Sequence, residues 1–339
     1  MFEPMFSRFR TAFLIFLLLP HECSVPKPSA AARLQHRAAG NSPELIALYE
    51  AWFGHPKHIS AGYSSQDPGI IESQIHHAQA MGISAFVVDW YGDREPFIDR
   101  SYGLMQRIAE KSKFKVAMMY DETDQEDPAT DEAIADFTMF HDTYLSAKAK
   151  GHEAYMTCEG RPMIFIFPKG RHTDWNKVRA IVSRWNPAPL LIYENDPGPS
   201  ADAFDGYYAW INPGEKGWAA DGSNWGEQFL SNFYQTMRNK YSDKIVVGGA
   251  WAIFDDSKAS WGLNRHMSAR CGQTYADTSN LWRREFDSDD PIPFLMIETW
   301  NDYEEGTAIE RGIPNCESGK QEPTLNSHSA TAHDPQTKP

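Results

Sequence analysis

The sequence of 339 residues contains only four cysteines, and no two of them have C-x-x-C or zinc-ligand spacing. Cys23 lies near the N-terminus and Cys316 near the C-terminus, so Cys158 and Cys271 are the two within the central part. These two could form a disulfide in an oxidising compartment, or they could be two buried thiols. Cysteine usage therefore excludes a zinc domain and a disulfide-rich scaffold.

Several motifs that identify enzyme classes are also missing. The chain has no P-loop, no dinucleotide-binding fingerprint, no H-E-x-x-H and no G-x-S-x-G. The acidic run 121–132 lacks the glycine and the spacing of an EF-hand loop, which favours a solvated loop over a calcium site. We therefore expect neither a metal nor a cofactor.

Basic residues are scarce relative to acidic ones. The chain has 32 Lys+Arg against 46 Asp+Glu, a formal charge of −14. Residues 1–40 are net positive, so the remainder is more acidic still and is repelled by phosphate backbones and anionic lipids. Nucleic-acid binding is thereby excluded. The 11 Trp and 14 Tyr suit neutral ligands that stack on rings, sugars above all, although aromatic residues also dominate cores.

The two ends of the chain differ in composition from its centre. Residues 1–23 resemble a signal peptide, with Arg8 and Arg10 before the eight-residue apolar run 12–19. That run is shorter than the roughly 20 residues that span a membrane. Residues 24–43 are predicted to be a linker, and residues 314–339 a disordered tail. We expect an exported protein, periplasmic or extracellular, with no stable membrane span after removal of the leader.

The central part, residues 44–313, repeats a short apolar run followed by a longer segment, often of helical period. Continuous apolar runs are typical of parallel strands that are buried on both faces. Eight such repeats in one domain favour a (β/α)8 TIM barrel over a doubly wound α/β sheet. The eight runs are 45–53, 83–90, 114–120, 162–167, 189–193, 206–211, 244–251 and 293–300.

The clearest helix signal follows the first run. Asp67 is a candidate N-cap, Pro68 suits the first helical position, and Gly82 suits the end. Helices are also predicted over 102–112, 131–150, 174–185 and 227–241. The connection between the fifth and sixth strands is too short for a full helix.

In a TIM barrel, reactive side chains lie at the carboxyl ends of the strands. Carboxylates and aromatic rings occur there in this sequence, as in a sugar-binding pocket. Glu298 could equally be a buried structural acid, and His55 and His58 could be pocket or solvated loop residues. The predicted substrate-binding residues are Tyr49, Trp52, Asp89, Trp90, Tyr91, Tyr120, Asp121, Glu194, Tyr208, Trp251, Glu298, Trp300, Asn301 and Tyr303.

Asp302 and Glu305 follow the eighth run and are three residues apart. In a turn, this spacing puts their side chains on one side, with Glu304 pointing elsewhere. Two close carboxylates do not ionise equally easily, which supplies an acid and a base for glycoside hydrolysis. Alternatively, Asp302 could cap the turn.

The segment W-N-D-Y-E-E-G-T-A-I-E, residues 300–310, resembles a signature that follows the last barrel strand in two related families. It shares E-G-T-x-I-E with glycoside hydrolase family 99, the endo-α-mannosidases and endo-α-mannanases. It shares W-N-D-Y with family 71, the α-1,3-glucanases. The segments 49–56 and 67–92 also resemble family 99. The resemblance covers most of residues 45–313 and implies a TIM-barrel hydrolase of α-linked oligo- or polysaccharides.

The resemblance implies catalytic roles for two residues. Glu305 aligns with the general acid/base. Asp302 aligns with the second carboxylate, which either assists the sugar 2-hydroxyl, as in family 99, or activates water, as in family 71. Here Asp302 replaces the longer Glu of family 99. Two other functions remain open: a non-catalytic glycan-binding barrel, and a protein of surface-polysaccharide biosynthesis.

Overall fold

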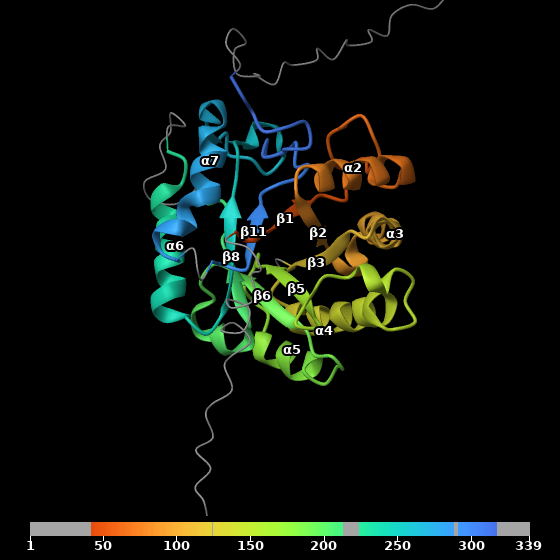
Figure 1. Cartoon of the computed structure of the whole chain (residues 1–339). Helices are drawn as coiled ribbons and strands as arrows, with labels where there is room; N and C mark the ends of the chain where they lie inside the picture. Colours follow the sequence, from red (N-terminus) through yellow and green to blue (C-terminus); the bar gives the residue numbers. More distant parts are fainter. Residues whose placement is uncertain (1–41, 124, 213–223, 288–290, 317–339) are drawn as a thin grey trace, which may run out of the picture.

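The computed structural model describes residues 42–123, 125–212, 224–287 and 291–316. Its core is a closed barrel of eight parallel strands, surrounded by helices (Figure 1). Neighbours in the sequence are neighbours in the barrel, and the ring closes between the last and first strands. The eight strands are β1 (Glu44–Tyr49), β2 (Ile83–Trp90), β3 (Lys115–Asp121), β5 (Arg161–Phe167), β6 (Leu190–Glu194), β7 (Gly206–Tyr208), β8 (Ile245–Ala250) and β11 (Phe294–Ile297).

The predicted (β/α)8 barrel in a single domain is therefore confirmed, and all eight apolar runs contain a strand. The strands are almost entirely buried because the barrel interior covers one face and the helices cover the other. A short strand β4 (Thr157–Cys158) pairs antiparallel with β5, and β9 (Phe254–Asp255) pairs with β10 (His266–Met267).

The first predicted helix is present with its signals. Helix α2 (Pro68–Ala80) starts after Asp67, whose side chain accepts hydrogen bonds from the backbone N–H groups of Gly69 and Ile70. Gly82 follows the helix with φ of +82°, a left-handed conformation that favours glycine. The sequence therefore determines both ends of this helix locally.

The other helices agree with the predictions to different degrees. Helix α6 (Glu227–Lys240) is as predicted, while α3 (Pro96–Ser112) starts six residues earlier than predicted because Pro96 opens it. Helix α5 (Trp175–Val182) is shorter than predicted. Between β6 and β7 there is a single 3₁₀ helix, Gly198–Ala203, where a full helix was excluded.

The helix predicted over 131–150 is wrong in its second half. Helix α4 (Ala129–Phe140) ends in a π-turn, His141–Leu145, after which Ser146 is extended. The turn lets Tyr144 pack against Tyr102 and Phe140. Helix α7 (Gln273–Asn280) was not predicted.

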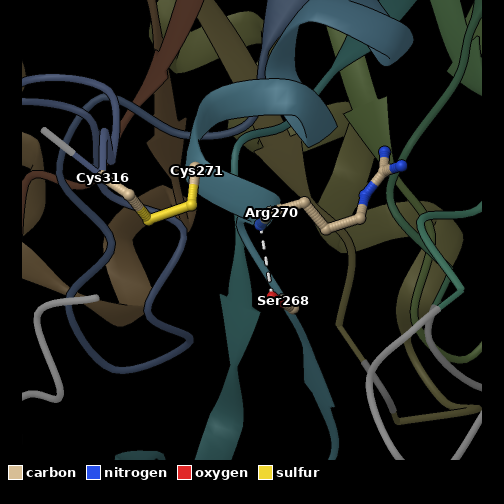
Figure 2. Close-up of a disulfide and its surroundings, with 4 residues drawn as sticks. All are labelled: Ser268, Arg270, Cys271 and Cys316. Carbon is tan, nitrogen blue, oxygen red and sulfur yellow. Dashed lines mark hydrogen bonds between the residues drawn. A yellow bond between two sulfur atoms is a disulfide. The ribbon is translucent and has the colours of Figure 1, made fainter. Parts of the chain in front are cut away.

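The sequence left open a disulfide between Cys158 and Cys271 or two buried thiols. Both alternatives are wrong for Cys271, which forms a disulfide with Cys316. Cys158 is a buried free thiol. Figure 2 shows the disulfide joining the turn before α7 to the C-terminal segment, beside a hydrogen bond from the Arg270 backbone N–H to Ser268. The tail predicted from residue 314 is thus attached to the barrel as far as Cys316.

The leader at 1–23, most of the linker and the tail beyond Cys316 lie outside the described residues. Across the described ranges, no helix has the length and apolar character needed to cross a membrane.

Candidate active site

A cavity of about 550 Å³ opens at the carboxyl ends of the barrel strands. Among the described residues, six acidic side chains and one lysine line it, and five Trp, Tyr or Phe rings form much of its wall. The acids are Glu50, Asp89, Glu95, Asp121, Asp302 and Glu305, the lysine is Lys169, and the rings are Trp52, Tyr91, Phe167, Trp210 and Trp261. Carboxylates beside exposed ring faces suit a sugar, whose hydroxyls donate hydrogen bonds and whose C–H faces stack on rings.

The structure brings six of the predicted site residues together in this cavity: Trp52, Asp89, Tyr91, Asp121, Asp302 and Glu305. Successive side chains of a strand point to opposite faces, so only alternate residues at the strand ends face the cavity. Glu50, Asp89 and Asp121 point inward, whereas Tyr49, Trp90 and Tyr120 point between the strands and the helices.

The hydrogen bonds of those three outward-pointing residues reflect this placement. Tyr49 donates to Gln74 of α2 at 2.8 Å, Trp90 to Asp99 of α3 at 3.1 Å, and Tyr120 to Asp136 of α4 at 3.1 Å. Each therefore ties a barrel strand to a helix.

Other predicted residues lie beside the cavity without lining it. Tyr208 is buried and donates to the Ile166 carbonyl at 3.0 Å, and the Trp251 indole donates to the Trp225 carbonyl at 2.9 Å. Burial raises the pKa of Glu194 to about 7, and Asn195 donates to its Oε1.

For Glu298 the sequence left open a role in substrate binding or as a buried structural acid. Glu298 is completely buried and accepts a hydrogen bond from the Ile211 backbone N–H. Burial raises its pKa well above the usual carboxyl range. Its side chain does not line the cavity.

The residues that follow β11 each contact a different part of the protein. Trp300 packs behind the barrel, its ring centroid 5.3 Å from that of Phe86. The Asn301 side chain accepts from the Glu50 backbone N–H at 2.7 Å and donates to the Glu50 carbonyl at 2.9 Å. Tyr303 donates to Glu310 at 2.6 Å. Asn301 therefore fixes the backbone that carries the Glu50 carboxylate.

Asp302 both caps the turn and lines the cavity. Its Oδ1 accepts from the backbone N–H groups of Glu304, at 2.8 Å, and Glu305, at 2.9 Å. Asp302 lines the cavity, and no hydrogen bond among the described residues occupies its Oδ2, so this oxygen can accept one from a ligand. The two alternatives drawn from the sequence, capping and cavity lining, thus describe the two oxygens of one side chain.

Glu304 points away from the cavity, as expected from its position between Asp302 and Glu305. Its carboxylate binds His58 Nδ1 at 2.8 Å and accepts from the Ile59 backbone N–H at 3.2 Å. His58 lines the cavity and stacks on Trp52, with ring centroids 4.4 Å apart and planes inclined by 5°. Glu304 and Trp52 together fix this imidazole.

Glu305 is held from the other side by a separate loop. The Trp261 indole N–H donates to its Oε1 at 2.9 Å, and the Asp255 backbone N–H donates to its carbonyl at 2.8 Å. Gly306 follows with φ of +66°, and a Cβ there would lie 3.0 Å from the Asp255 carbonyl oxygen. Only glycine fits this close approach without displacement.

Burial and mutual repulsion change the proton affinity of the cavity acids. Burial, with repulsion from Glu305 next, raises the pKa of Asp302 well above its usual range. Burial raises the pKa of Glu305, and the Trp261 donor opposes that rise. Burial also raises the pKa of Asp89 to about 6.

The pKa of Asp121 is raised to about 8 by burial and by Asp89, against the opposing effect of Lys169, 2.7 Å away. Acids with raised pKa values can hold a proton near neutral pH, which is what a general acid requires.

Glu50, Lys169 and Trp210 were expected from the sequence at the strand ends, but they were not among the predicted substrate-binding residues, and Trp261 was not expected at the site. The position of the first three at the ends of strands is the sequence signal for them. Trp261 carries no such signal, because it lies in the loop between β9 and β10, far in sequence from the residue that it contacts. In the described ranges, no group of three or more His, Cys, Asp or Glu side chains is arranged to hold a metal ion.

These features define a TIM barrel with a carboxylate-rich, aromatic-walled cavity, and solved structures share this fold. An endo-α-mannosidase of glycoside hydrolase family 99 from Bacteroides thetaiotaomicron superposes with a TM-score of 0.62 at 19% identity, over 80% of this chain and 87% of that chain. A second structure of this enzyme gives 0.57 at 17% identity, over 80% and 87%. A glycoside hydrolase-like protein gives 0.57 at 14% identity, over 79% and 87%.

The fold is therefore that of a family 99-like barrel, as the sequence resemblance implied. At these identities the similarity concerns the fold. The sequence matches no protein-family model and no curated protein.

Proposed function

We propose that this protein is a glycoside hydrolase that cleaves α-linked oligo- or polysaccharides. The observation that carries the proposal is the placement of Asp302 and Glu305 in one cavity, within the motif that resembles families 99 and 71. The fold shared with an endo-α-mannosidase supports the α-linked class of substrate.

In the proposed mechanism, Glu305 donates its proton to the glycosidic oxygen as the bond to the anomeric carbon breaks. Burial raises the pKa of Glu305, which favours the protonated acid that this step requires. The two neighbouring acids share one proton, and the reactive state has it on Glu305 with Asp302 ionised. Asp302 then accepts a proton through Oδ2, either from the sugar 2-hydroxyl, which attacks the anomeric carbon, or from an attacking water. Two backbone N–H groups on Oδ1 hold Asp302 in place for this step.

The remaining cavity residues would bind the sugar. Tyr91 and Trp210, which are partly exposed, offer ring surface, and Asp89 and Asp121 offer hydrogen-bond acceptors. The Oε2 atom of Glu50 is buried without a hydrogen-bond partner in the described structure, and a sugar hydroxyl would satisfy it.

The test is hydrolysis of α-mannans, α-1,3-glucan and other α-glucans by the purified full chain, with product anomers followed by proton NMR. Glu305→Gln and Asp302→Asn should each lower turnover by about 10²–10⁴-fold while leaving the fold intact. Glu110→Gln, on an exposed face of α3, is the matched control and should be fully active.

Full activity in Glu305→Gln would contradict the assignment. Glycan affinity without turnover on any of these substrates would favour a non-catalytic glycan-binding barrel. Neither affinity nor turnover would leave a role in surface-polysaccharide biosynthesis as the better hypothesis.

A further inference from the structure

The loop between β9 and β10 exposes apolar side chains at the mouth of the cavity. In the described parts of the chain, only two large hydrophobic side chains are exposed: Trp261, at 46%, and Leu263, at 71%. Trp261 lines the cavity, whereas Leu263 does not. Burying a tryptophan ring is favourable, so a half-exposed ring in the wall of a cavity gains free energy when a ligand covers it.

Although exposed, Trp261 is held in one place. Its indole donates to Glu305 Oε1 at 2.9 Å. Its ring meets Trp52 edge-on, with centroids 6.1 Å apart, and His58 at 6.5 Å. The ring therefore contacts two cavity-lining side chains at the same time as its N–H group contacts a third.

The loop that carries Trp261 is built around a buried carboxylate. Asp256 is completely buried and accepts from the backbone N–H groups of Leu263, at 3.1 Å, and Arg265, at 2.6 Å. The Arg265 guanidinium also binds it, at 2.7 Å. These bonds on both sides of Trp261 fix the loop, so the position of the indole is part of the folded structure.

We propose that Trp261 is a positioning residue for Glu305: its indole N–H occupies Oε1, directs Oε2 toward the substrate as the proton-carrying oxygen, and binds the ionised carboxylate more tightly than the protonated one. Hydrogen bonds to a charged acceptor are stronger than those to a neutral one, which gives the preference its direction. The ring of Trp261 forms a side wall for the sugar.

Other charged groups also face Glu305 and set the background against which Trp261 acts. Arg265 favours the ionised form, whereas the acidic groups oppose it. They come from four places: Asp302 and Glu304 from its own segment, Asp256 from the loop, Glu50 from the end of β1, and Glu298 from the end of β11. None of these groups is altered by a substitution at Trp261.

The first test follows the indole N–H resonances of the tryptophans by NMR as pH is varied, and it requires no activity. The Trp261 resonance is identified by its loss in Trp261→Phe. It should titrate with the pKa of Glu305 in the wild type and stop titrating in Glu305→Gln. Leu263→Ala, on the same loop, should leave the titration unchanged. An indole resonance that does not titrate, or that titrates equally in Glu305→Gln, would overturn the proposal.

The second test is kinetic and rests on the proposed function. Trp261→Phe keeps a ring but removes the donor, so the basic limb of the pH profile of kcat/KM should move up by about one pH unit. Trp261→Ala should show the same shift and raise KM by up to about tenfold, because the wall is lost as well. An unshifted basic limb in an active Trp261→Phe variant would refute the proposal, whereas inactivity of the wild type would refute only the glycosidase assignment.

Discussion

Asn301 illustrates how one side chain can control the cavity without facing it. It lies next to the predicted catalytic Asp302, and its amide group binds both backbone polar groups of Glu50, which is 251 positions away in the sequence. Bonding of an amide to both groups fixes the orientation of the peptide. Asn301 therefore connects the segment after β11 to the end of β1.

Asn301→Ala should lower the free energy of unfolding by about 2–4 kcal/mol, since it leaves a buried N–H and a buried carbonyl of Glu50 without partners. Asn301→Asp keeps the acceptor but removes the donor, and it adds a charge beside other acids, so it should also destabilise the fold. Urea denaturation measures both changes, with the exposed Asn176→Ala as control. A loss below about 0.5 kcal/mol in Asn301→Ala would show that Asn301 does not fix this backbone.

At the residue scale, the sequence predicts the types of residue in the cavity better than their individual placement. The spacing of Asp302 and Glu305 was sufficient to expect both on one side of a turn. Strand polarity was sufficient to expect acids and rings at the strand ends. Whether Trp90 or Tyr91 faces the cavity depends on which residue of the strand points inward, a register that apolar composition alone does not supply when the run is buried on both faces.

At the scale of elements, the strands were predictable because each is a continuous apolar run, and helix α2 because its cap and stop residues are local. The end of α4 was not predictable, since the π-turn at His141–Leu145 depends on the packing of Tyr144 against the Tyr102 ring of helix α3. The loop that brings Trp261 to Glu305 was likewise not predictable. It is held by hydrogen bonds from the backbone N–H groups of Leu263 and Arg265 to the Asp256 side chain, and no sequence motif indicates these bonds.

The disulfide between Cys271 and Cys316, which are 45 positions apart in the sequence, connects the turn before α7 to the C-terminal segment. Such a cross-link restricts the unfolded chain. The Cys271→Ser/Cys316→Ser double variant should therefore unfold about 2–4 kcal/mol more easily than the oxidised wild type.

Urea denaturation with and without reductant measures this effect. Reductant should destabilise the wild type to the level of the double variant and leave the variant unchanged. Equal stability of variant and oxidised wild type would show that the cross-link does not stabilise the fold.

At the scale of the whole molecule, the barrel concentrates acidic side chains in one cavity, where Lys169 is the one lysine among the described lining residues. Burying so many like charges together raises their pKa values, so the folded protein binds protons more tightly than the unfolded chain. An acid whose pKa is raised by folding stabilises the fold fully below its unfolded pKa and loses that contribution as pH rises through its folded pKa. For Asp121 this interval runs from about pH 4 to about pH 8.

Asp121→Asn removes the cost of ionising this buried acid. We therefore compare the melting temperature of the variant with that of the wild type at each pH. The variant should gain on the wild type by about 2 °C or more between pH 5 and pH 9. Thermal unfolding at both pH values measures the difference, and Asp243→Asn, at an exposed site, is the control. A difference between variant and wild type that is the same at both pH values would contradict the raised pKa of Asp121.

The central claim, that Glu305 is the proton donor in glycoside cleavage, is tested most directly by changing the leaving group. We would measure single-turnover cleavage of an α-linked glycan and of an aryl α-glycoside with a highly acidic leaving group. The aryl leaving group needs no protonation, so Glu305→Gln should lose about 10²–10⁴-fold on the glycan but much less on the aryl glycoside. Asp302→Asn should lose activity on both. Equal losses on the two substrates for Glu305→Gln, or no loss on either, would contradict the account.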